Sequence, residues 1–280
     1  MAADFGNLRV LSLESRRSRE MAQLIANYGG QPTVVASTRE VPSGPNAEAV
    51  EFATRLLEGK FAAVIFMTGV GTRALAKAIE ETCPTDKLVA ALNKVVVVAR
   101  GPKPMSVLRE WGVPVSLTVP EPNTWRELLQ VLDQNKEKIP LNGANVAVQE
   151  HGLPSVELYG GLQERGAVVF AVPVYKWEPP EDTGALKEAI RTLASGNFDV
   201  VLFTSSVQVY HLFRFSEEIG QHRDVSEGLR RAVIGSIGPV TSGTLREFGV
   251  TPDLEPTHPK MGFLVKETAE SSSSLLQRKR

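Results

Sequence analysis

Four short segments carry the residues that could bind a ligand. Thr68–Arg73 (Thr-Gly-Val-Gly-Thr-Arg) and Thr204–Ser206 (Thr-Ser-Ser) each follow an apolar run, as do Arg100–Lys103 (Arg-Gly-Pro-Lys) and Ile237–Thr241 (Ile-Gly-Pro-Val-Thr). Each segment places small or hydroxyl-bearing residues where a helix should begin. The unpaired N–H groups of a helix start, together with the helix dipole, favour anions. The segments therefore suggest a site for a small molecule with several negative charges.

Helix capping is the competing explanation. Serine and threonine also cap helices that bind nothing, and Gly-Pro is a common turn, so capping is the simpler interpretation of any single segment. Four segments of this type, arranged as two similar pairs, favour ligand binding. A hydrogen bond to a charged group contributes about 1.5–3 kcal/mol. Four helix starts could therefore hold a polycarboxylate without a large excess of basic residues.

Three side chains near these segments have two interpretations each. Lys103 lies between two prolines at a helix start and either binds a carboxylate or is an ordinary exposed lysine. Arg16 follows the first predicted strand and either faces the ligand or lines a solvated helix. Tyr175 lies on a predicted strand over residues 172–177. Its phenol could donate a proton to a leaving hydroxyl, or it could pack as an aromatic at a domain junction.

No motif indicates a metal, a catalytic thiol or a dinucleotide. Cys83 is the one cysteine, which excludes an intrachain disulfide and a cysteine metal cluster. Residues 69–71 lack the full G-x-G-x-x-G spacing, and G-x-S-x-G is absent. The four histidines lack the spacing of a metal site: His151, His211, His222 and His258. We therefore expect no cofactor and no metal, and a reaction that depends on positioning and weak acid catalysis.

The elements that must position these residues alternate along the chain. Short Val- and Ile-rich runs alternate with stretches of helical period, which predicts an α/β protein with mostly parallel sheets. The predicted strands are Leu8–Leu13, Ala62–Met67, Val95–Ala99, Asn145–Val148, Val168–Val172, Val200–Phe203 and Val233–Ser236. The predicted helices are Ser18–Tyr28, Asn46–Leu57, Arg73–Glu81, Thr124–Asn135, Ser155–Arg165, Thr183–Leu193 and Val240–Phe248. Several strands are apolar at consecutive positions, as expected where both faces are covered.

The chain contains an internal duplication. Phe61–Phe66 matches Phe198–Phe203, Gly101-Pro102 matches Gly238-Pro239, and Leu108–Val113 matches Leu245–Val250, each 137 positions later. Three segments with one shift, in one order, indicate a repeat. The sequence thus predicts two similar domains that face each other across a ligand cleft.

The domain boundaries follow from an exchange between the two repeats. No flexible linker lies near residues 141–143, so we expect each domain to exchange its first βα unit, with crossings on the strands at 32–37 and 172–177. This assigns residues 1–37 and 176–268 to lobe 1 and residues 38–175 to lobe 2. Residues 269–280 are rich in serine and end in three basic residues, which predicts a disordered tail.

Composition narrows the class of protein. The chain has 280 residues, enough for two domains of about 100–150 residues each. Apolar residues make up 42% and charged residues 22%, as in globular proteins. The net charge of −1 argues against a nucleic-acid partner. Neither a signal peptide nor a membrane helix is recognisable, so we expect a cytoplasmic protein without a membrane partner. No long exposed apolar helix stands out, which favours a monomer.

Several motifs resemble those of the uroporphyrinogen-III synthase family. They are Phe203-Thr-Ser-Ser206, Ile237-Gly-Pro-Val-Thr241, Pro252-Asp253 with Pro256, Lys260-Met-Gly262, Thr68-Gly-Val-Gly-Thr-Arg73, Arg100-Gly-Pro-Lys103 and Val172-Pro-Val-Tyr175. Their order and spacing cover nearly the whole chain except the tail. The resemblance implies two flavodoxin-like lobes joined by two strands, and no cofactor. It also implies the reaction. Hydroxymethylbilane, with eight carboxylates, loses its hydroxyl, forms a spiro intermediate at the last pyrrole and closes with that ring inverted.

The resemblance also implies residue roles. Tyr175 matches the tyrosine proposed to assist departure of the hydroxyl. Ser205, Ser206 and Thr241 match positions that contact substrate in the C-terminal lobe, and the motifs with Thr68, Gly69 and Lys103 match loops of the other lobe. Together with helix-start residues, the substrate-binding candidates are Thr68, Gly69, Lys103, Ser205, Ser206, Gly238, Thr241 and Arg16.

One departure from the family pattern motivates an alternative. Met67–Gly71 (Met-Thr-Gly-Val-Gly) differs from the commoner Thr-Ser-x-x-Gly/Ala pattern. It is closer to a subgroup in which this domain precedes a DNA-binding module. The second hypothesis is therefore a non-catalytic module of the same fold that senses a tetrapyrrole or another polyanion. A third, a periplasmic-type binding protein, is disfavoured because no signal peptide is recognisable.

Overall fold

The chain folds into two compact units. The computed structural model describes residues 3–44, 46–150, 152 and 154–279. Unit 1 is Met1–Arg39 with Glu178–Arg280, and unit 2 is Glu40–Trp177. The chain therefore passes from one unit to the other twice, and each boundary expected from the sequence lies two residues before the corresponding point. Among the described residues, no helix is both long and apolar enough to cross a membrane.

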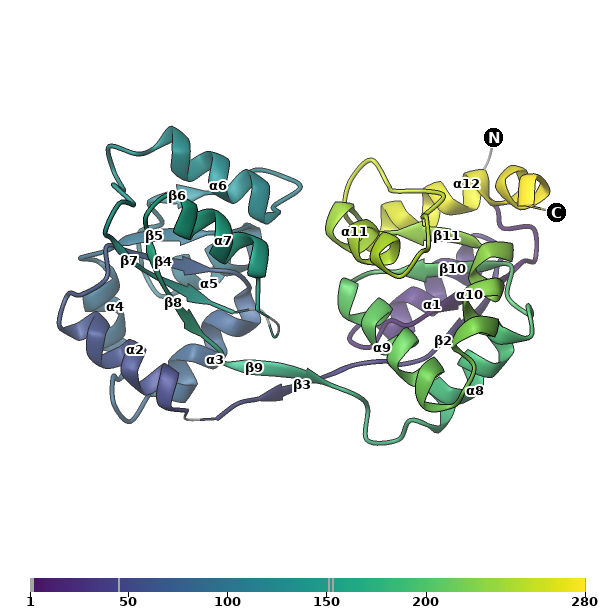
Figure 1. Ribbon diagram of the computed structural model, residues 1–280, viewed down its shortest axis with the longest axis horizontal. Coiled ribbons are helices and arrows are strands. Elements are labelled where there is room, and N and C mark those ends of the chain that lie inside the picture. Colours follow the sequence, from purple (N-terminus) through teal and green to yellow (C-terminus); the bar gives the residue numbers. More distant parts are fainter. Residues whose placement is uncertain (1–2, 45, 151, 153, 280) are drawn as a thin grey trace. The chain divides into compact units, whose positions relative to one another are not determined.

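Unit 2 is built on a five-stranded parallel sheet of order β6-β5-β4-β7-β8 (Figure 1). Its strands are β4 (Ala63–Phe66), β5 (Val96–Ala99), β6 (Leu117–Thr118), β7 (Asn145–Gln149) and β8 (Val168–Val172). Its helices are α2 (Ala47–Leu57), α3 (Gly69–Ile79), α4 (Thr85–Leu92), α5 (Pro102–Glu110), α6 (Trp125–Gln134) and α7 (Val156–Glu164). All four residues of β4 are buried, which explains its unbroken apolar run.

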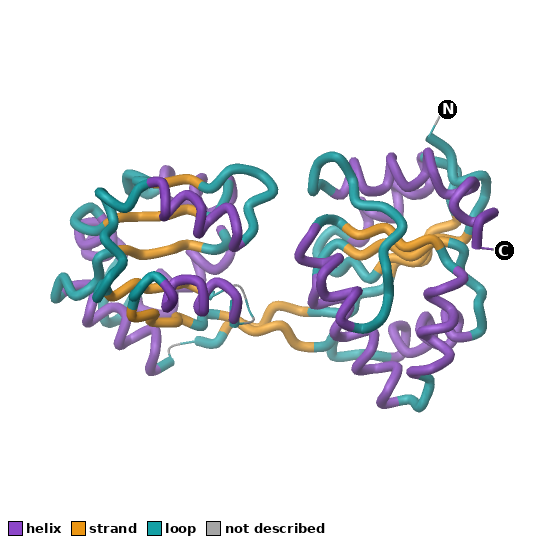
Figure 2. The backbone as a smooth tube through the Cα atoms, turned by 45° about the horizontal axis from the view of Figure 1, so that its top comes forward, coloured by secondary structure: helices purple, strands orange, loops and turns teal. Residues whose placement is uncertain are grey.

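Helices cover both faces of this sheet (Figure 2). On one face, α2, α3, α4 and α5 pack in a core with strand residues such as Val64 and Val97. On the other face, α6 and α7 pack against the alternate residues, such as Ile65 and Val98. The start of α6 is fixed by a capping box, in which Thr124 and Glu127 satisfy each other's backbone N–H groups. The result is a three-layer α/β/α unit.

Unit 1 repeats this architecture around a parallel sheet of order β11-β10-β1-β2. Its strands are β1 (Arg9–Ser12), β2 (Gln31–Val34), β10 (Val200–Phe203) and β11 (Val233–Ser236). Its helices are α1 (Ser18–Asn27), α8 (Gly184–Ala194), α9 (Ser206–Glu218), α10 (His222–Arg231), α11 (Pro239–Glu247) and α12 (Met261–Lys279). A single parallel bridge between Gly235 and Leu254 takes the place that β6 has beside β5.

The predicted duplication and the predicted exchange are both confirmed. β10, β11 and α11 begin and end 137 positions after β4, β5 and α5. The N-terminal unit β1-α1-β2 lies beside β10, where β7-α7-β8 lies beside β4 in the other unit. The first βα unit of the chain therefore completes the sheet formed mainly by the C-terminal segment.

The crossing segments form a separate two-stranded sheet of β3 (Arg39–Pro42) and β9 (Tyr175–Glu178) (Figure 1). The expectation that residues 32–37 form one crossing strand is wrong. β2 ends at Val34 because Gln31–Val34 pairs with β1 inside unit 1, and the crossing follows only from Arg39 onward. The other crossing begins at Tyr175, at the end of the range expected from the sequence.

The prediction of a disordered tail is also wrong. Residues 261–279 form one helix, α12, and Ala269, Ser272 and Leu276 are buried. Arg280 lies outside the described residues. The sheet of unit 1 needs apolar cover on its second face, where Val10 and Leu202 pack in one core with α1 and α12. Helix α12 therefore supplies the layer that α6 supplies in unit 2.

Candidate functional site

In each unit, the candidate residues lie at the carboxyl edge of the sheet. In unit 2, Thr68 follows β4 and begins α3, Arg100 follows β5, and Glu150 follows β7. Because β5, β4 and β7 are parallel neighbours, the residues that follow them share one edge. Open α/β sheets bind ligands at this edge. In unit 1, Glu14, Thr204 and Ile237 follow β1, β10 and β11 in the same way.

The best-defined pair is Tyr175 with Thr68. The Tyr175 phenol oxygen lies 3.4 Å from Thr68 Oγ1, and either hydroxyl can donate. Thr68 Oγ1 also accepts from the Gly71 N–H at 3.0 Å, which caps α3. The tyrosine is only 3% exposed, and its ring packs edge-on against Trp177 with centroids 5.8 Å apart. The phenol is therefore held at the start of a helix, where a proton can pass between two hydroxyls.

Gly69 and Lys103 are also brought together. A Cβ atom on Gly69 would lie 2.9 Å from the backbone oxygen of Lys103, so only glycine permits this close approach of α3 to α5. The Lys103 side chain is exposed, and within the described part of the chain it has no ion pair. Thr68, Gly69, Lys103 and Tyr175 thus form one group in unit 2.

Arg100 is a member of this edge that the list of candidates from the sequence omitted. Its backbone N–H donates to Phe66 O at 3.0 Å, which extends the pairing of β5 with β4. Part of the side chain reaches solvent, yet the surrounding protein desolvates the guanidinium and lowers its pKa, while the Tyr175 phenol acts in the opposite direction. The motif Arg100–Lys103 drew attention to the helix start, but only the fold places this arginine near Tyr175.

Two carboxylates occupy equivalent places in the two units. The registers Val10↔Val200 and Ala63↔Val146, with the 137-residue repeat, make Glu14 equivalent to Glu150. Tyr159 donates its phenol hydrogen to Glu150 at 2.6 Å. Burial, and then this carboxylate, raise the pKa of Tyr159 well above its ordinary value. Glu150 is therefore satisfied from within unit 2.

Glu14 is a residue of the carboxyl edge of unit 1 that the sequence did not reveal. Its carboxylate accepts the backbone N–H groups of Arg16 and Arg17, each at 3.1 Å, and the hydroxyl of Thr204. A carboxylate of the chain itself thus lies in the turn that precedes α1. The backbone N–H of Arg16 is therefore engaged within the chain, beside the carboxylate of Glu14. The contact between Glu14 and Thr204 spans 190 positions, so no local pattern indicates it.

The other candidates of unit 1 lie at two neighbouring helix starts. Ser205 precedes α9 without a side-chain capping bond, and Ser206 is its first residue. Gly238 precedes α11, and Thr241 lies in its first turn, 3% exposed. The Ile237 N–H donates to Phe203 O at 2.9 Å and so joins the two strand ends. These four residues and Arg16 form a second group, in unit 1.

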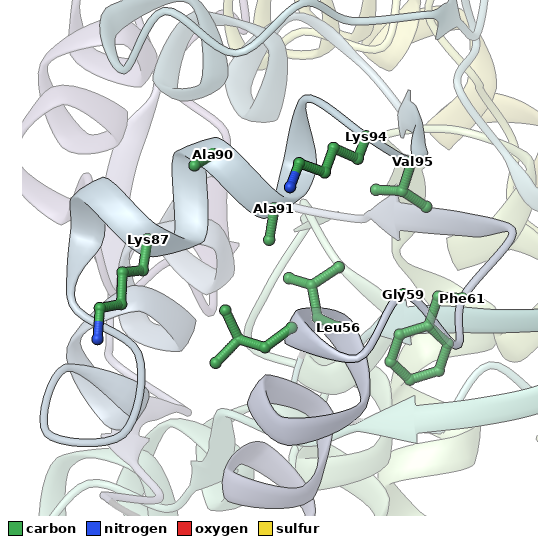
Figure 3. Close-up of a pocket in the computed structure, with 9 residues that line it drawn as sticks. Leu56, Gly59, Phe61, Lys87, Ala90, Ala91, Lys94 and Val95 are labelled. Atoms are coloured by element: carbon green, nitrogen blue, oxygen red, sulfur yellow. The ribbon is translucent and has the colours of Figure 1, made fainter.

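Two further features of the described residues were compared with these groups, possible metal clusters and a hollow. These residues contain no cluster of three or more His, Cys, Asp or Glu side chains able to hold a metal; His151 lies outside them. One hollow, of about 210 Å³, lies between α2 and α4, where Leu56 and Ala91 line it with Lys87 and Lys94 (Figure 3). Gly59 and Val95, at its rim, precede β4 and β5. The hollow is therefore at the amino ends of these strands, away from Tyr175.

Comparison with known proteins identifies similar chains over nearly the full length. The family model for uroporphyrinogen-III synthase HemD matches residues 19–266. A Methanothermobacter thermautotrophicus protein named "Putative uroporphyrinogen-III synthase" is 31% identical over 238 residues, 84% of this chain and 87% of that one. "Uncharacterized protein YjjA" of Bacillus subtilis strain 168 is 30% identical over 257 residues, 91% and 93% of the two chains.

Solved structures show the same fold. The crystal structure of a mutant uroporphyrinogen III synthase from the extremely thermophilic bacterium Thermus thermophilus superposes with a TM-score of 0.69. It covers 98% of this chain and 100% of its own, at 24% identity. At that identity the likeness establishes the fold alone.

Proposed function

This chain belongs to the uroporphyrinogen-III synthase HemD family, and we propose that it is a cofactor-free uroporphyrinogen-III synthase. It would act as a hydro-lyase that dehydrates hydroxymethylbilane and closes it to the macrocycle with inversion of ring D. The proposal rests mainly on the buried phenol of Tyr175, which lies beside the hydroxyl of Thr68. Both residues lie at the carboxyl edge of the sheet of unit 2, in the part of the chain that the family model matches.

Tyr175 is proposed as the general acid. As the C–O bond of the hydroxymethyl group breaks, the phenol would give its proton to the departing oxygen, so that water leaves. Closure of the macrocycle releases one proton from the attacked pyrrole carbon. Thr68, 3.4 Å from the phenol, would receive this proton as it gives its own to the phenolate, which restores the acid for the next turnover. Proton transfer of this kind contributes about 10²- to 10⁴-fold to rates. The remainder of the acceleration would come from holding the two ends of the bilane together.

Residues of both units are proposed to bind the substrate. In unit 2 these are Thr68, Gly69 and Lys103. In unit 1 they are Ser205, Ser206, Gly238, Thr241 and Arg16. The helix starts of α3, α5, α9 and α11 present N–H groups suited to carboxylates. A substrate with eight carboxylates matches such a set of neutral donors in a chain whose net charge is only −1.

A sensing module is the second candidate. Glu14 favours it, because this carboxylate lies in the turn just before α1 and would repel a polyanion there. The departure at Met67–Gly71 from the commoner family motif points the same way. In this case the protein would bind a tetrapyrrole without converting it.

One experiment separates the two candidates. Purified protein is mixed with freshly generated hydroxymethylbilane, and the products are oxidised and resolved as porphyrin isomers by chromatography. Uncatalysed closure gives the type I isomer, so the synthase proposal requires type III to dominate. A folded protein that binds the bilane and yields only type I would overturn the synthase and support the sensor.

A further inference from the structure

Arg100 carries a charge that its own protein leaves unneutralised. Within the described part of the chain, its guanidinium makes neither an ion pair nor a side-chain hydrogen bond. A partly desolvated cation without a counter-charge is costly for a fold. Burial lowers the pKa of the guanidinium, which is consistent with this cost.

Among the described residues no acid pairs with Arg100, and several acids of unit 2 have other partners. Glu150 accepts the phenol hydrogen of Tyr159, and Asp133 binds Arg165 through two hydrogen bonds. Glu110 pairs with Arg73, and Glu127 caps α6. A bound carboxylate would supply the counter-charge that these acids do not.

The internal repeat supplies a comparison within one molecule. At the shift of 137 positions, Gly101-Pro102 recurs as Gly238-Pro239, but Arg100 is replaced by Ile237 and Lys103 by Val240. The strand and the helix around these positions are the same length in both units. The same backbone therefore forms with isoleucine at this position, so the fold does not require an arginine here. Ile237 packs against the core of unit 1, whereas Arg100 places a partly exposed charge at the carboxyl edge of unit 2.

We propose that Arg100 binds a carboxylate of the ligand and makes unit 2 the acid-selective half of the protein. This inference rests on the proposed function in so far as the ligand is a carboxylated tetrapyrrole. The planar guanidinium can hold a carboxylate through two parallel hydrogen bonds. The bound carboxylate then lies close to Tyr175 and to the start of α5, where Lys103 adds a second positive charge. Unit 1, with Ile237 and Val240 at the equivalent positions, has no such contact.

The test measures ligand binding and empty-state stability in the same variants. Arg100→Ile introduces the residue that the other repeat carries at this position, and Arg109→Gln, on the exposed face of α5, is the control for loss of one positive charge. Uroporphyrin III, which has eight carboxylates, is titrated by fluorescence. We expect Arg100→Ile to raise its Kd about 10- to 100-fold, as loss of a charged hydrogen-bonded contact does. Arg109→Gln should change it less than about twofold.

The second measurement excludes a structural role. Because Arg100 is unneutralised in the empty protein, Arg100→Ile should leave the melting temperature without ligand unchanged or raise it by about 2–4 °C. A melting temperature lowered by several degrees would show that Arg100 supports the fold, and would overturn the proposal. So would an unchanged Kd in this variant, or a wild-type protein that does not bind uroporphyrin III.

The outcome is independent of the test for synthase activity. Wild-type protein that yields only the type I isomer, with binding that still depends on Arg100, removes the enzyme and retains the carboxylate contact. Wild-type protein that yields type III, with Arg100→Ile binding normally, retains the enzyme and removes the contact.

Discussion

Replacing Tyr175 by phenylalanine removes one oxygen atom and little else. The ring keeps its edge-on contact with Trp177, and Thr68 keeps the hydrogen bond from Gly71 that caps α3. The lost contact with Thr68, at 3.4 Å, is long for a hydrogen bond between hydroxyls. We expect it to contribute about 1 kcal/mol or less to the free energy of unfolding. The melting temperature should therefore fall by no more than about 2–4 °C.

Turnover should change far more than stability. If the phenol gives its proton to the leaving hydroxyl, Tyr175→Phe should lower kcat by roughly 10- to 1,000-fold, or about 1.4–4 kcal/mol in activation free energy. Initial rates of type III formation over a range of hydroxymethylbilane concentrations separate kcat from KM. A fall in kcat with little change in KM is the signature expected of an acid that acts in the transition state.

Tyr159→Phe is the matched control, because it removes the same atom from the same unit. Tyr159 donates to buried Glu150 at 2.6 Å, so its loss should leave that carboxylate without its partner and cost about 1–3 kcal/mol of stability. Turnover measured well below the melting temperature should stay within about twofold of wild type. The reasoning is refuted if Tyr175→Phe turns over at the wild-type rate. It is refuted equally if both variants lose activity in proportion to their loss of stability.

Three further perturbations test the structure around these groups. Gly152 has a φ of +91°, and a Cβ atom there would lie 2.5 Å from the Trp177 ring. Gly152→Ala should therefore lower the free energy of unfolding in urea by about 1–3 kcal/mol and should also lower turnover. Wild-type values of both would contradict this packing. Leu276→Ala should lower the unfolding free energy by about 2–4 kcal/mol, because α12 packs against the core. An unchanged unfolding free energy would instead support a disordered tail. Burial lowers the pKa of His211, whose Nδ1 lies 2.5 Å from Ser37 O. The unfolded state therefore takes up a proton first as pH falls below about 6.5, and stability should fall by up to about 1.4 kcal/mol per pH unit until the folded pKa is reached. Urea titrations at pH 7.5 and 5.5 should show this fall in wild type and a smaller one in His211→Gln.

The fold was predictable because the duplication and the apolar runs are independent signals that agree. β4 and β5 are buried on both faces and recur as β10 and β11, so each copy supports the other. The prediction of a disordered tail was wrong for a specific reason. Leu264, Thr268, Ser272 and Leu276 are all buried, at the four-residue spacing of a helix face. Two of the four carry hydroxyls, so a pattern that counts only apolar residues ends too early.

The candidate site was predictable only where its residues mark local structure. Thr68 and Gly238 begin helices, and such starts have a recognisable composition. Glu14 and Arg100 have no local signature. The role of Glu14 depends on Thr204, far along the chain, and that of Arg100 depends on acids that pair elsewhere. Whether a charge is satisfied is a property of the folded molecule, which no local pattern of residues records.

The differences between the two repeats carry their own information about the ligand. Strands β4 and β5 have the same lengths as β10 and β11, while the residues that follow β5 and β11 have diverged, so that Arg100 corresponds to Ile237 and Lys103 to Val240. The equivalent acids also differ in partner, since Glu14 is held by N–H groups and Glu150 by a phenol. A ligand with two identical halves would favour identical residues at equivalent positions. Divergence at the carboxyl edges is what the proposed substrate would favour, because the two ends of a linear tetrapyrrole with one hydroxymethyl terminus differ chemically.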